Sequence, residues 1–351
     1  MAFHRDSTFH LRRMGRRLSP GSIAKCLVAV LTLVTNSCRR APSEEGFRVA
    51  LVTPGSVSDA AWNSGAYAGL LLIRDSLGAQ VSQVEARTPG EQEDNLRRYA
   101  AEGYDIVFGH GFEFQGAAER VSSEYPRTIF VITSGERQTG NVTPLVFRFH
   151  EGTFLAGMVA GGMTRSGVLG FVGGIELPPI RLGYDGWVNG ARRVNQAVQT
   201  RSIYLNSFDD VAAGREAALQ LIRLGADMLH HNADAAALGL FQAVKESPAV
   251  FAFGANADQS ALAPGRVIGS AVIDLPAAFL LVGREVNEGR FVPRVESFGL
   301  ESRVIRFEIN PAIAGAVPAE LLARIDGARD SIIAGTLDPL QAASPALAAG
   351  H

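Results

Sequence analysis

The sequence contains one structural unit twice. Gly103 opens a stretch that is expected to run through a strand, a turn and a helix to Pro126, where an apolar run begins. Gly225 opens a matching stretch that reaches Pro248 and a second apolar run. The glycines and the prolines are each 122 positions apart, so the register holds without a gap. The repeat predicts two similar α/β lobes, and a cleft between two lobes can hold a small ligand.

Strands and helices are expected to alternate from residue 47 onward. The near-continuous apolar run Phe47–Thr53 is typical of a parallel strand that is covered on both faces. Further strands are expected near residues 80–85, 105–109, 128–132, 167–172, 202–205, 226–230 and 250–254. This alternation predicts doubly wound parallel sheets with helices on both faces. Ligands in such folds bind beyond the carboxyl ends of the strands, so the loops that follow the strands are expected to form the site.

Length and charge narrow the possible functions. A chain of 351 residues is long enough for two domains, and 47% apolar with 19% charged residues is typical of a globular protein. The net charge of −2, without a long basic block in the body of the chain, gives no electrostatic footprint for nucleic acid. Lys25 and Lys245 are the only lysines in the sequence, so almost no lysine is available for a site.

The N-terminus has the pattern of a secretory signal. Five basic residues between Arg12 and Lys25 precede an apolar run at residues 26–34, which is too short to span a bilayer but fits the apolar region of a signal peptide. Either Met1 or Met14 can be the start. The pattern predicts that the protein is exported.

Cys38 ends this segment and has two possible interpretations. A small residue, Ser37, precedes it, and this resembles the cleavage site of bacterial lipoproteins, in which the cysteine becomes lipid-modified. The alternative is an ordinary signal peptide with an incidental cysteine. The other cysteine, Cys26, lies in the same segment, so the mature body can contain no internal disulfide.

The loops after the expected strands carry a series of motifs. The segment 59–70, DAAWNSGAYAGL, resembles the first-loop signature of the basic membrane protein family of substrate-binding lipoproteins. Further matches follow in the family's order at residues 109–112 (GHGF), 151–157 (EGTFLAG), 170–174 (GFVGG), 207–210 (SFDD), 258–259 (DQ) and 332–335 (IIAG). The resemblance covers residues 47–338. It implies a type I periplasmic binding fold, a small-molecule ligand, often a purine or other nucleoside, and an ABC permease with ATPase subunits as partners.

A flat base is held by aromatic faces together with a few hydrogen-bonding groups. On this reasoning and the resemblance, the expected ligand-binding residues are Asp59, Trp62, Asn63, Gly111, Phe112, Asn256 and Asp258, with Trp187, His231 and Asp234 as weaker candidates. Trp62 is the expected stacking surface. Structural roles remain open for several of them: Phe112 can plug its lobe, Asn63 can cap a helix, Asp59 can form an Asx turn and Trp187 can belong to the core.

The sequence departs from the family pattern at two positions. An Asp usual two residues before the Asp-Gln pair is Asn256 here, and a usual lysine is replaced by Ile273. Loss of both members of a charged pair need not destabilise a protein, whereas loss of one leaves a buried charge unpaired. The usual glycine-rich loop reads NADAAA at residues 232–237, and the added Cβ atoms narrow the access to backbone. These changes predict a reshaped site for a flat heteroaromatic ligand held mainly by stacking.

The leading interpretation is an exported, lipid-anchored receptor of an ABC importer, with no catalytic activity, cofactor or metal. A sensor of the same fold without transport is the alternative, and an enzyme acting on nucleosides is a third class. The sequence has no nucleophile elbow, phosphate loop or His-Glu-x-x-His motif. The carboxylate pair Asp209-Asp210 is expected to cap the helix near Ala212.

The predicted organisation assigns residues 1–38 to the signal peptide, 39–46 to a tether, 47–150 and 274–300 to the N-terminal lobe, 151–273 and 301–338 to the C-terminal lobe, and 339–351 to a tail. The chain is then expected to cross between the lobes near residues 149–152, 271–274 and 298–303. Such a multi-strand hinge allows the lobes to close on a ligand.

Overall fold

The computed structural model describes residues 46–59 and 61–342. The predicted signal peptide, Cys38 and most of the predicted tail lie outside these residues.

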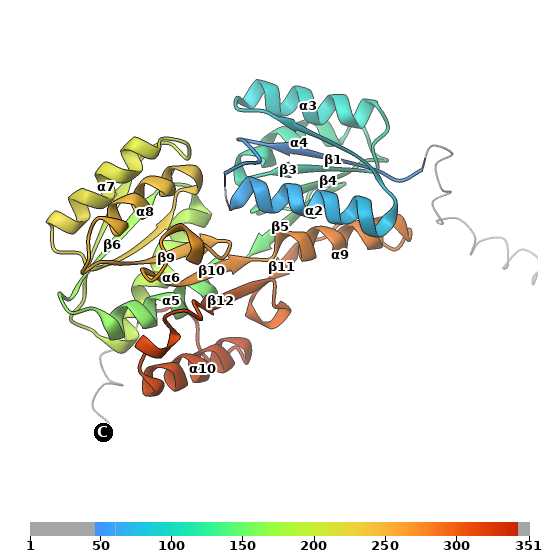
Figure 1. Ribbon diagram of the computed structural model, residues 1–351. Coiled ribbons are helices and arrows are strands. Elements are labelled where there is room, and N and C mark those ends of the chain that lie inside the picture. The colour runs from blue at the N-terminus through green and yellow to red at the C-terminus, as the bar shows by residue number, and fades with distance from the viewer. Residues whose placement is uncertain (1–45, 60, 343–351) are drawn as a thin grey trace, which may run out of the picture. The chain divides into compact units, whose positions relative to one another are not determined.

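The first sheet has the strand order β11-β5-β4-β3-β1-β2, and every neighbouring pair in it is parallel (Figure 1). Its strands are β1 (Arg48–Thr53), β2 (Gln80–Glu85), β3 (Ile106–His110), β4 (Ile129–Thr133), β5 (Val142–Phe147) and β11 (Glu296–Phe298). The helices that pack with it are α2 (Trp62–Leu77), α3 (Pro89–Ala101), α4 (Gln115–Ser122) and α9 (Leu275–Asn287). In Figure 1, α2 and α9 lie side by side, and α3 and α4 lie together on the other side of the strands.

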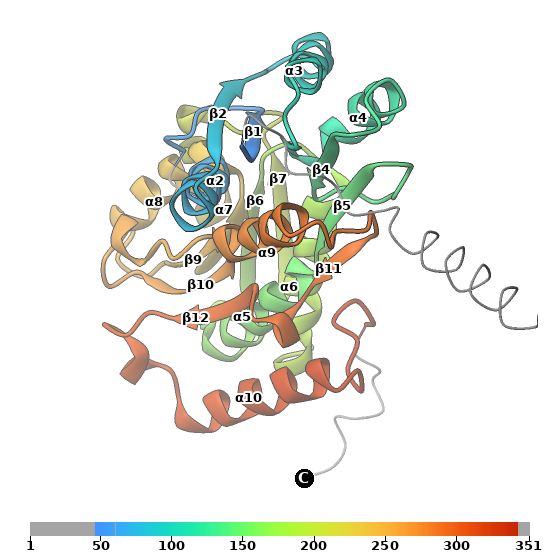
Figure 2. The same cartoon turned by 90° about the vertical axis from the view of Figure 1, so that its right-hand side faces the viewer.

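The second sheet has the order β12-β10-β9-β8-β6-β7 and is parallel except for the pair of β10 and β12. Its strands are β6 (Val168–Gly173), β7 (Gln199–Tyr204), β8 (Met228–Asn232), β9 (Phe251–Asn256), β10 (Val267–Ile273) and β12 (Ile305–Ile309). The accompanying helices are α5 (Phe149–Met163), α6 (Pro178–Val194), α7 (Val211–Arg223), α8 (Ala237–Lys245) and α10 (Ala319–Ile333). Helix α10 runs alongside α5 (Figure 2).

Short 3-10 turns complete the chain. They are η1 (Phe112–Phe114), η2 (Asp234–Ala236), η3 (Ser260–Leu262), η4 (Leu300–Ser302) and η5 (Ala314–Ala316). Turns η1 and η2 start 122 positions apart, as do β3 and β8, and β4 and β9. The structure therefore confirms the two similar α/β lobes predicted from the repeat.

Local chemistry explains why the repeated elements form. Gly103 and Gly225 lie between a helix and the next strand with φ of 81° and 95°, a region that glycine adopts without steric cost. Thr88 and Glu91 form a capping box at the start of α3. Strand β3, which is parallel to both of its neighbours, is buried along its whole length, as expected for a parallel strand covered on both faces.

The described chain passes between the two sheets after β5, after β10 and after β11. Arg148 and Glu151 form an ion pair of 2.6 Å at the first crossing, and the Glu151 carboxylate also accepts a hydrogen bond of 2.7 Å from the backbone N–H of Leu300 at the third. Arg306 binds Asp274 at 3.0 Å beside the second crossing. A hydrogen bond and an ion pair thus connect the segments of the multi-strand hinge to one another.

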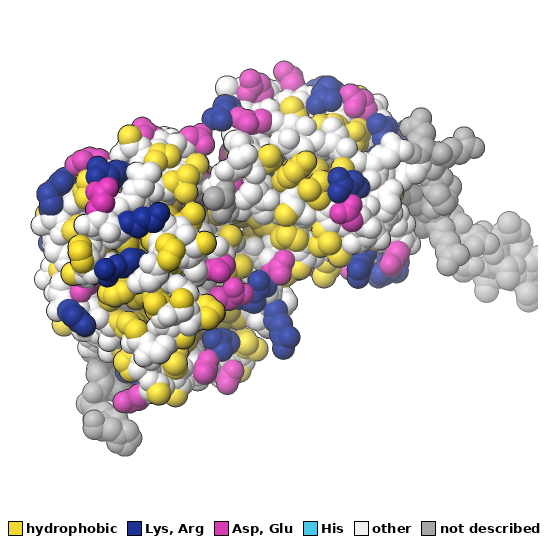
Figure 3. Space-filling view, in the orientation of Figure 1, with side chains coloured by type: hydrophobic (Ala, Val, Ile, Leu, Met, Phe, Trp, Pro, Cys, Tyr) yellow, Lys and Arg dark blue, Asp and Glu magenta, His cyan; other side chains and the backbone are white. Residues whose placement is uncertain are grey.

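The charged side chains on the face in Figure 3 are of mixed sign, with Lys and Arg interspersed among Asp and Glu. Most of the ion pairs on the described residues join partners that are at least one third exposed, such as Arg74 with Asp75. Exposed pairs of this kind contribute little to stability. The buried apolar residues of the two sheets and their helices therefore carry most of the stability of the fold.

Candidate ligand-binding cleft

A hollow of about 590 Å³, open to solvent, lies at the carboxyl ends of strands from both sheets. We call it the cleft. Its lining residues are Pro54, Trp62, Gly111, Phe112, Glu113, Ser134, Phe147, Phe149, Leu177, Pro179, Ile180, Phe208, Asn232, Asp234, Asn256 and Ile273. The position is the one at which parallel α/β sheets bind ligands.

Equivalent loops of the two repeats contribute to the cleft. Phe112 and Asp234 are 122 positions apart and start η1 and η2, and Ser134 and Asn256 are 122 apart at the ends of β4 and β9. Ser134, Asp234 and Asn256 have φ of 56°, 44° and 66°. Non-glycine residues rarely adopt positive φ values, because this conformation is strained. Residues that do adopt it are held there by the surrounding structure and are often found at ligand sites.

Trp62 is the first residue of α2, and one face of its indole is packed against His110. The two ring centroids are 4.2 Å apart with an angle of 25° between the planes. His110 Nε2 lies 3.1 Å from the Trp62 carbonyl oxygen and Nδ1 lies 2.9 Å from Thr133 Oγ1. Burial lowers the pKa of His110 to about 3, so the imidazole is neutral at neutral pH. His110 therefore holds the indole in place from one side.

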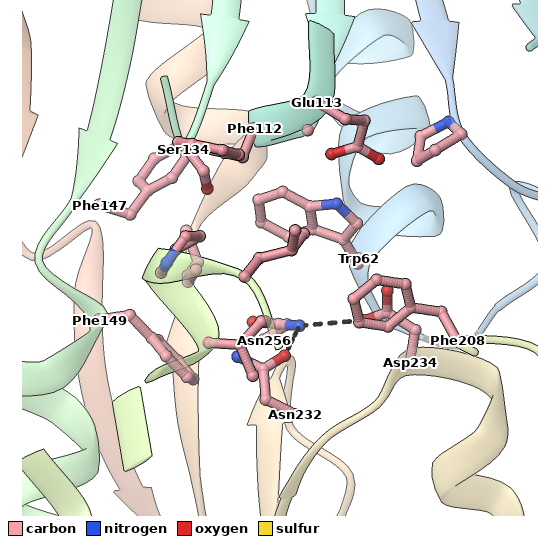
Figure 4. Close-up of a pocket in the computed structure, with 16 residues that line it drawn as sticks. Trp62, Phe112, Glu113, Ser134, Phe147, Phe149, Phe208, Asn232, Asp234 and Asn256 are labelled. Atoms are coloured by element: carbon pink, nitrogen blue, oxygen red, sulfur yellow. Dashed lines mark hydrogen bonds between the residues drawn. The ribbon is translucent and has the colours of Figure 1, made fainter. Parts of the chain in front are cut away.

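Further aromatic rings line the cleft from several elements. Phe112 lies in η1, Phe147 at the end of β5, Phe149 at the start of α5 and Phe208 in the loop after β7 (Figure 4). The Phe147 ring contacts the Trp62 ring edge to face, with centroids 6.3 Å apart. Such a wall offers flat apolar surfaces from both halves of the chain, which suits a flat ring as ligand.

Two carboxylates, two amides and the hydroxyl of Ser134 are the polar side chains of the lining. Asn256 Nδ2 donates to Asp234 Oδ1 at 3.3 Å and to Asn232 Oδ1 at 3.4 Å (Figure 4). Glu113 is exposed and lines the cleft. Burial raises the pKa of Asp234 well above its ordinary value, and the nearby carboxylates of Asp59, Glu113 and Asp209 raise it further.

Five of the ten predicted ligand-binding residues line the cleft. They are Trp62, Gly111, Phe112, Asp234 and Asn256, and Ile273 lines it too. Gly111 has a φ of 142°, which only glycine adopts readily.

Asp59 and Asn63 do not line the cleft. The buried Asp59 carboxylate accepts hydrogen bonds from the backbone N–H groups of Ala61, Asn63 and Ser64 at 3.1, 2.6 and 2.9 Å, and from Asn63 Nδ2 at 2.9 Å. Its oxygens are therefore occupied at the start of α2, where unpaired N–H groups need acceptors. Asp59 therefore stabilises the backbone at the start of α2, as the Asx-turn interpretation predicted.

The remaining predicted residues also lie away from the cleft. Asp258 is exposed and accepts hydrogen bonds from Ser260. Trp187 is fully buried, and its ring centroid lies 5.6 Å from that of His230. His231 is buried and lies 2.8 Å from Gln259 Oε1. These side chains belong to the interior or to the surface of the second half.

Asp209 and Asp210 have separate roles, which corrects the expectation that the pair caps α7. Asp210 accepts from the backbone N–H of Ala213 at 2.9 Å and is the cap. Asp209 instead binds Arg87 of the first repeat at 2.9 Å. Arg87 and Asp209 are 122 positions apart, so equivalent loops of the two repeats meet in this ion pair.

Glu113, Phe147, Phe149 and Phe208 were missed from the sequence. Phe208 lies within the SFDD motif, and Phe149 lies at a predicted crossing between lobes, so both carried a usable signal. Glu113 directly follows Phe112, a predicted ligand-binding residue, but no feature of the sequence indicated that Glu113 itself lines the cleft.

Solved structures define the class of fold. An ABC transporter solute-binding protein from Aeropyrum pernix K1 superimposes with a TM-score of 0.76 at 23% identity, covering 83% of this chain and 92% of that one. One from Conexibacter woesei DSM 14684 has a TM-score of 0.68 at 28% identity and covers 84% and 98%. The chain therefore has the type I fold of periplasmic solute-binding proteins, as predicted.

The family is shown by the sequence as a whole. Residues 47–324 match the model of the Bmp family, ABC transporter substrate-binding proteins that are PnrA-like, and the chain belongs to this family. Basic membrane protein A2 of Borrelia garinii is 29% identical over 306 residues, which are 82% of this chain and 86% of that protein. The transcriptional activator protein Med of Bacillus subtilis is 24% identical over 265 residues, covering 75% and 82%.

Within residues 46–59 and 61–342, no helix combines the length and the apolar character needed to cross a membrane. The same residues contain no cluster of three His, Cys, Asp or Glu side chains suited to a metal ion.

Proposed function

We propose that the protein is the extracytoplasmic receptor of an ABC importer and that it binds a nucleoside or a related heteroaromatic solute in the cleft. The observation that carries the ligand class is the indole of Trp62, backed by His110 and surrounded by phenylalanine rings from both repeats. Stacking on such rings contributes about 1–3 kcal/mol per base. The family supports the receptor role, because its members are substrate-binding proteins.

Binding combines stacking with a small set of polar contacts. The Asn232 and Asn256 amides can both donate and accept, so they suit the edge of a base or a ribose hydroxyl. A charge-assisted bond from an aspartate at position 256 would be stronger than this amide bond by roughly 1 kcal/mol or more. The ligand is therefore held mainly through its ring, with weaker discrimination between nucleoside and free base than an aspartate would give.

The multi-strand hinge allows the two lobes to close on a ligand in the cleft. The proposal places residues 47–150 and 274–300 in one lobe and residues 151–273 and 301–338 in the other. A ligand that touches lining residues of both lobes binds the closed arrangement better than the open one and shifts the population toward it. The closed receptor then delivers the solute to the permease and its ATPase subunits.

The proposal also includes export and a lipid anchor at Cys38. Substrate-binding proteins of ABC transporters work outside the cytoplasm, so a tether at residues 39–46 would keep the receptor near its permease. The lipoprotein-like sequence around Cys38 supports this part of the proposal.

A thermal-shift screen of the purified mature protein over nucleosides, bases, flavins and sugars tests the ligand class, because a ligand stabilises the state that it binds. Stabilisation by nucleosides or bases is expected. Stabilisation by sugars alone would overturn the proposal. Chemical conversion of a bound nucleoside would show that the protein is an enzyme and not a receptor.

The second candidate is a sensor that regulates without transport. It is favoured by the similarity to Med, which is named as a transcriptional activator. Uptake of a labelled ligand by cells with and without the protein separates the two functions. Uptake that falls when the protein is deleted supports the receptor, and unchanged uptake favours the sensor.

A further inference from the structure

The polar groups of the cleft are biased toward negative charge. Of its lining residues in the described chain, Glu113 and Asp234 are acidic and none is Lys, Arg or His. Ile273, an apolar residue, also lines the cleft. An anionic ligand would thus meet carboxylates without a compensating cation.

The nearby cations are already bound to other carboxylates. Arg87 at the loop after β2 binds Glu85 and Asp209, Arg148 binds Glu151 and Glu301, and Arg181 on α6 binds Glu176. Neither Glu113 nor Asp234 forms an ion pair with a basic side chain among the described residues. The hydrogen bond from Asn256 is the polar contact that Asp234 receives.

The aromatic lining makes the same charge preference stronger. Trp62, Phe112, Phe147, Phe149 and Phe208 surround the hollow, and the faces of aromatic rings attract cations through the ring quadrupole. A neutral base gains stacking from these rings, whereas a cationic ring gains stacking and electrostatic attraction together. Figure 4 shows the Glu113 carboxylate pointing toward the side of the hollow occupied by Trp62.

We infer that the physiological ligand is a flat heteroaromatic compound that carries a positive charge, such as an N-alkylated or protonated base, and that Glu113 and Asp234 neutralise it. The inference rests on the proposed function and specifies the charge of the solute that enters the same cleft. The rings hold the flat part, and the carboxylates from the two repeats supply the counter-charge on either side.

The burial of Asp234, together with repulsion by neighbouring carboxylates, raises its pKa and gives this inference a pH dependence. Asp234 accepts a hydrogen bond from the Asn256 amide, and the carboxylates of Asp59, Glu113 and Asp209 act on it electrostatically. Arg87 is bound to Asp209. Helix α7, which packs against η2, has Asp210 as its cap and carries Arg215, which is bound to Glu246. A carboxyl whose pKa is raised holds its proton more tightly than an ordinary aspartic acid and must lose it to pair with a cation. The affinity for a permanent cation should therefore rise with pH, and that for a neutral ring should not.

The experiment compares ligand pairs that differ in charge. Calorimetry on the intact mature protein measures 1-methyladenosine, which is a delocalised cation at neutral pH, against adenosine, and N1-methylnicotinamide against nicotinamide. We expect each cation to bind about tenfold more tightly than its neutral partner, which corresponds to about 1.4 kcal/mol. The affinity for N1-methylnicotinamide should rise with pH, while that for nicotinamide stays constant.

Three variants test the assigned carboxylates. Asp234→Asn is nearly isosteric, and Asn tolerates the φ of 44° at this position, so the variant is expected to fold. In Asp234→Asn and in Glu113→Gln the ratio of cation to neutral affinity should fall toward one. Glu216→Gln removes the same charge from an exposed site on α7, where Glu216 binds Arg223, and should leave the ratio unchanged.

The outcomes separate the two proposals. If adenosine binds as tightly as 1-methyladenosine, the charge inference is overturned and the heteroaromatic receptor stands. A ratio that survives both carboxylate substitutions also overturns the inference. If neither cation binds, the inference fails, and if a non-aromatic sugar binds in their place, the proposed function fails with it.

Discussion

Replacement of Trp62 by alanine should weaken binding more than any other single substitution in the cleft. The indole already rests on His110 and touches Phe147, so its orientation is set before the ligand arrives. Loss of one aromatic stacking surface costs about 1–3 kcal/mol per base. This corresponds to a Kd that is about 5- to 150-fold larger.

The loss of affinity in Trp62→Ala is to be compared with the loss on removing the Asn256 side chain. Asn256 has a φ of 66°, so an alanine there would add backbone strain, whereas Asn256→Gly removes the side chain without it. Loss of one neutral hydrogen bond is expected to cost about 0.5–1.5 kcal/mol. Calorimetry with one ligand on wild type, Trp62→Ala, Trp62→Phe and Asn256→Gly gives the order directly.

Trp62→Phe is the matched control, since it keeps a ring against His110 and should retain most of the affinity. Thermal unfolding of each variant without ligand shows that it is folded. If Asn256→Gly abolishes binding while Trp62→Ala is tolerated, the stacking account is refuted and Trp62 is a structural residue of its loop.

Other predictions concern the anchor, the hinge and the helix packing. Metabolic labelling with a fatty acid should mark the wild type and not Cys38→Ser; equal labelling of both would exclude lipidation at this site. Small-angle scattering should show a smaller radius of gyration when a verified ligand saturates the protein, and an unchanged radius would argue against hinge closure. Gly190→Ala should destabilise the protein by about 2 kcal/mol or more, because the added Cβ would lie 1.9 Å from the Phe154 carbonyl oxygen. Gly327→Ala in α10 places its Cβ in open space and should stabilise the protein by about 0.5–1 kcal/mol. Denaturant unfolding measures both changes, and equal effects would contradict this account of the α5–α6 contact.

Much of the fold could be predicted because the repeat fixes so many elements at once. An offset of 122 residues relates β3 to β8, η1 to η2 and β4 to β9, and one repeat then predicts the order of the other. Trp62, Gly111 and Phe112 were found for a similar reason: each follows closely after a parallel strand, in the connecting loop or at the start of the next helical element.

The polar ligand-binding residues were harder to predict, because the same side chain can form hydrogen bonds with a ligand or with the protein backbone. Asp59 has the chemistry of a hydroxyl acceptor, yet its oxygens are occupied by N–H groups of its own helix. Sequence does not reveal which acceptors are already used, since that depends on the path of the loop. Phe147 was missed for a related reason: a phenylalanine at the end of an apolar strand has the same pattern whether it is buried in a core or lines a cleft.

A crystal structure of the protein with 1-methyladenosine tests the central claim most directly. The account predicts that the base lies in the cleft against the face of the Trp62 indole opposite His110, with Glu113 and Asp234 beside the ring and the amides of Asn232 and Asn256 within hydrogen-bonding distance. A base bound elsewhere, or one that lies in the cleft without touching the indole, would contradict it.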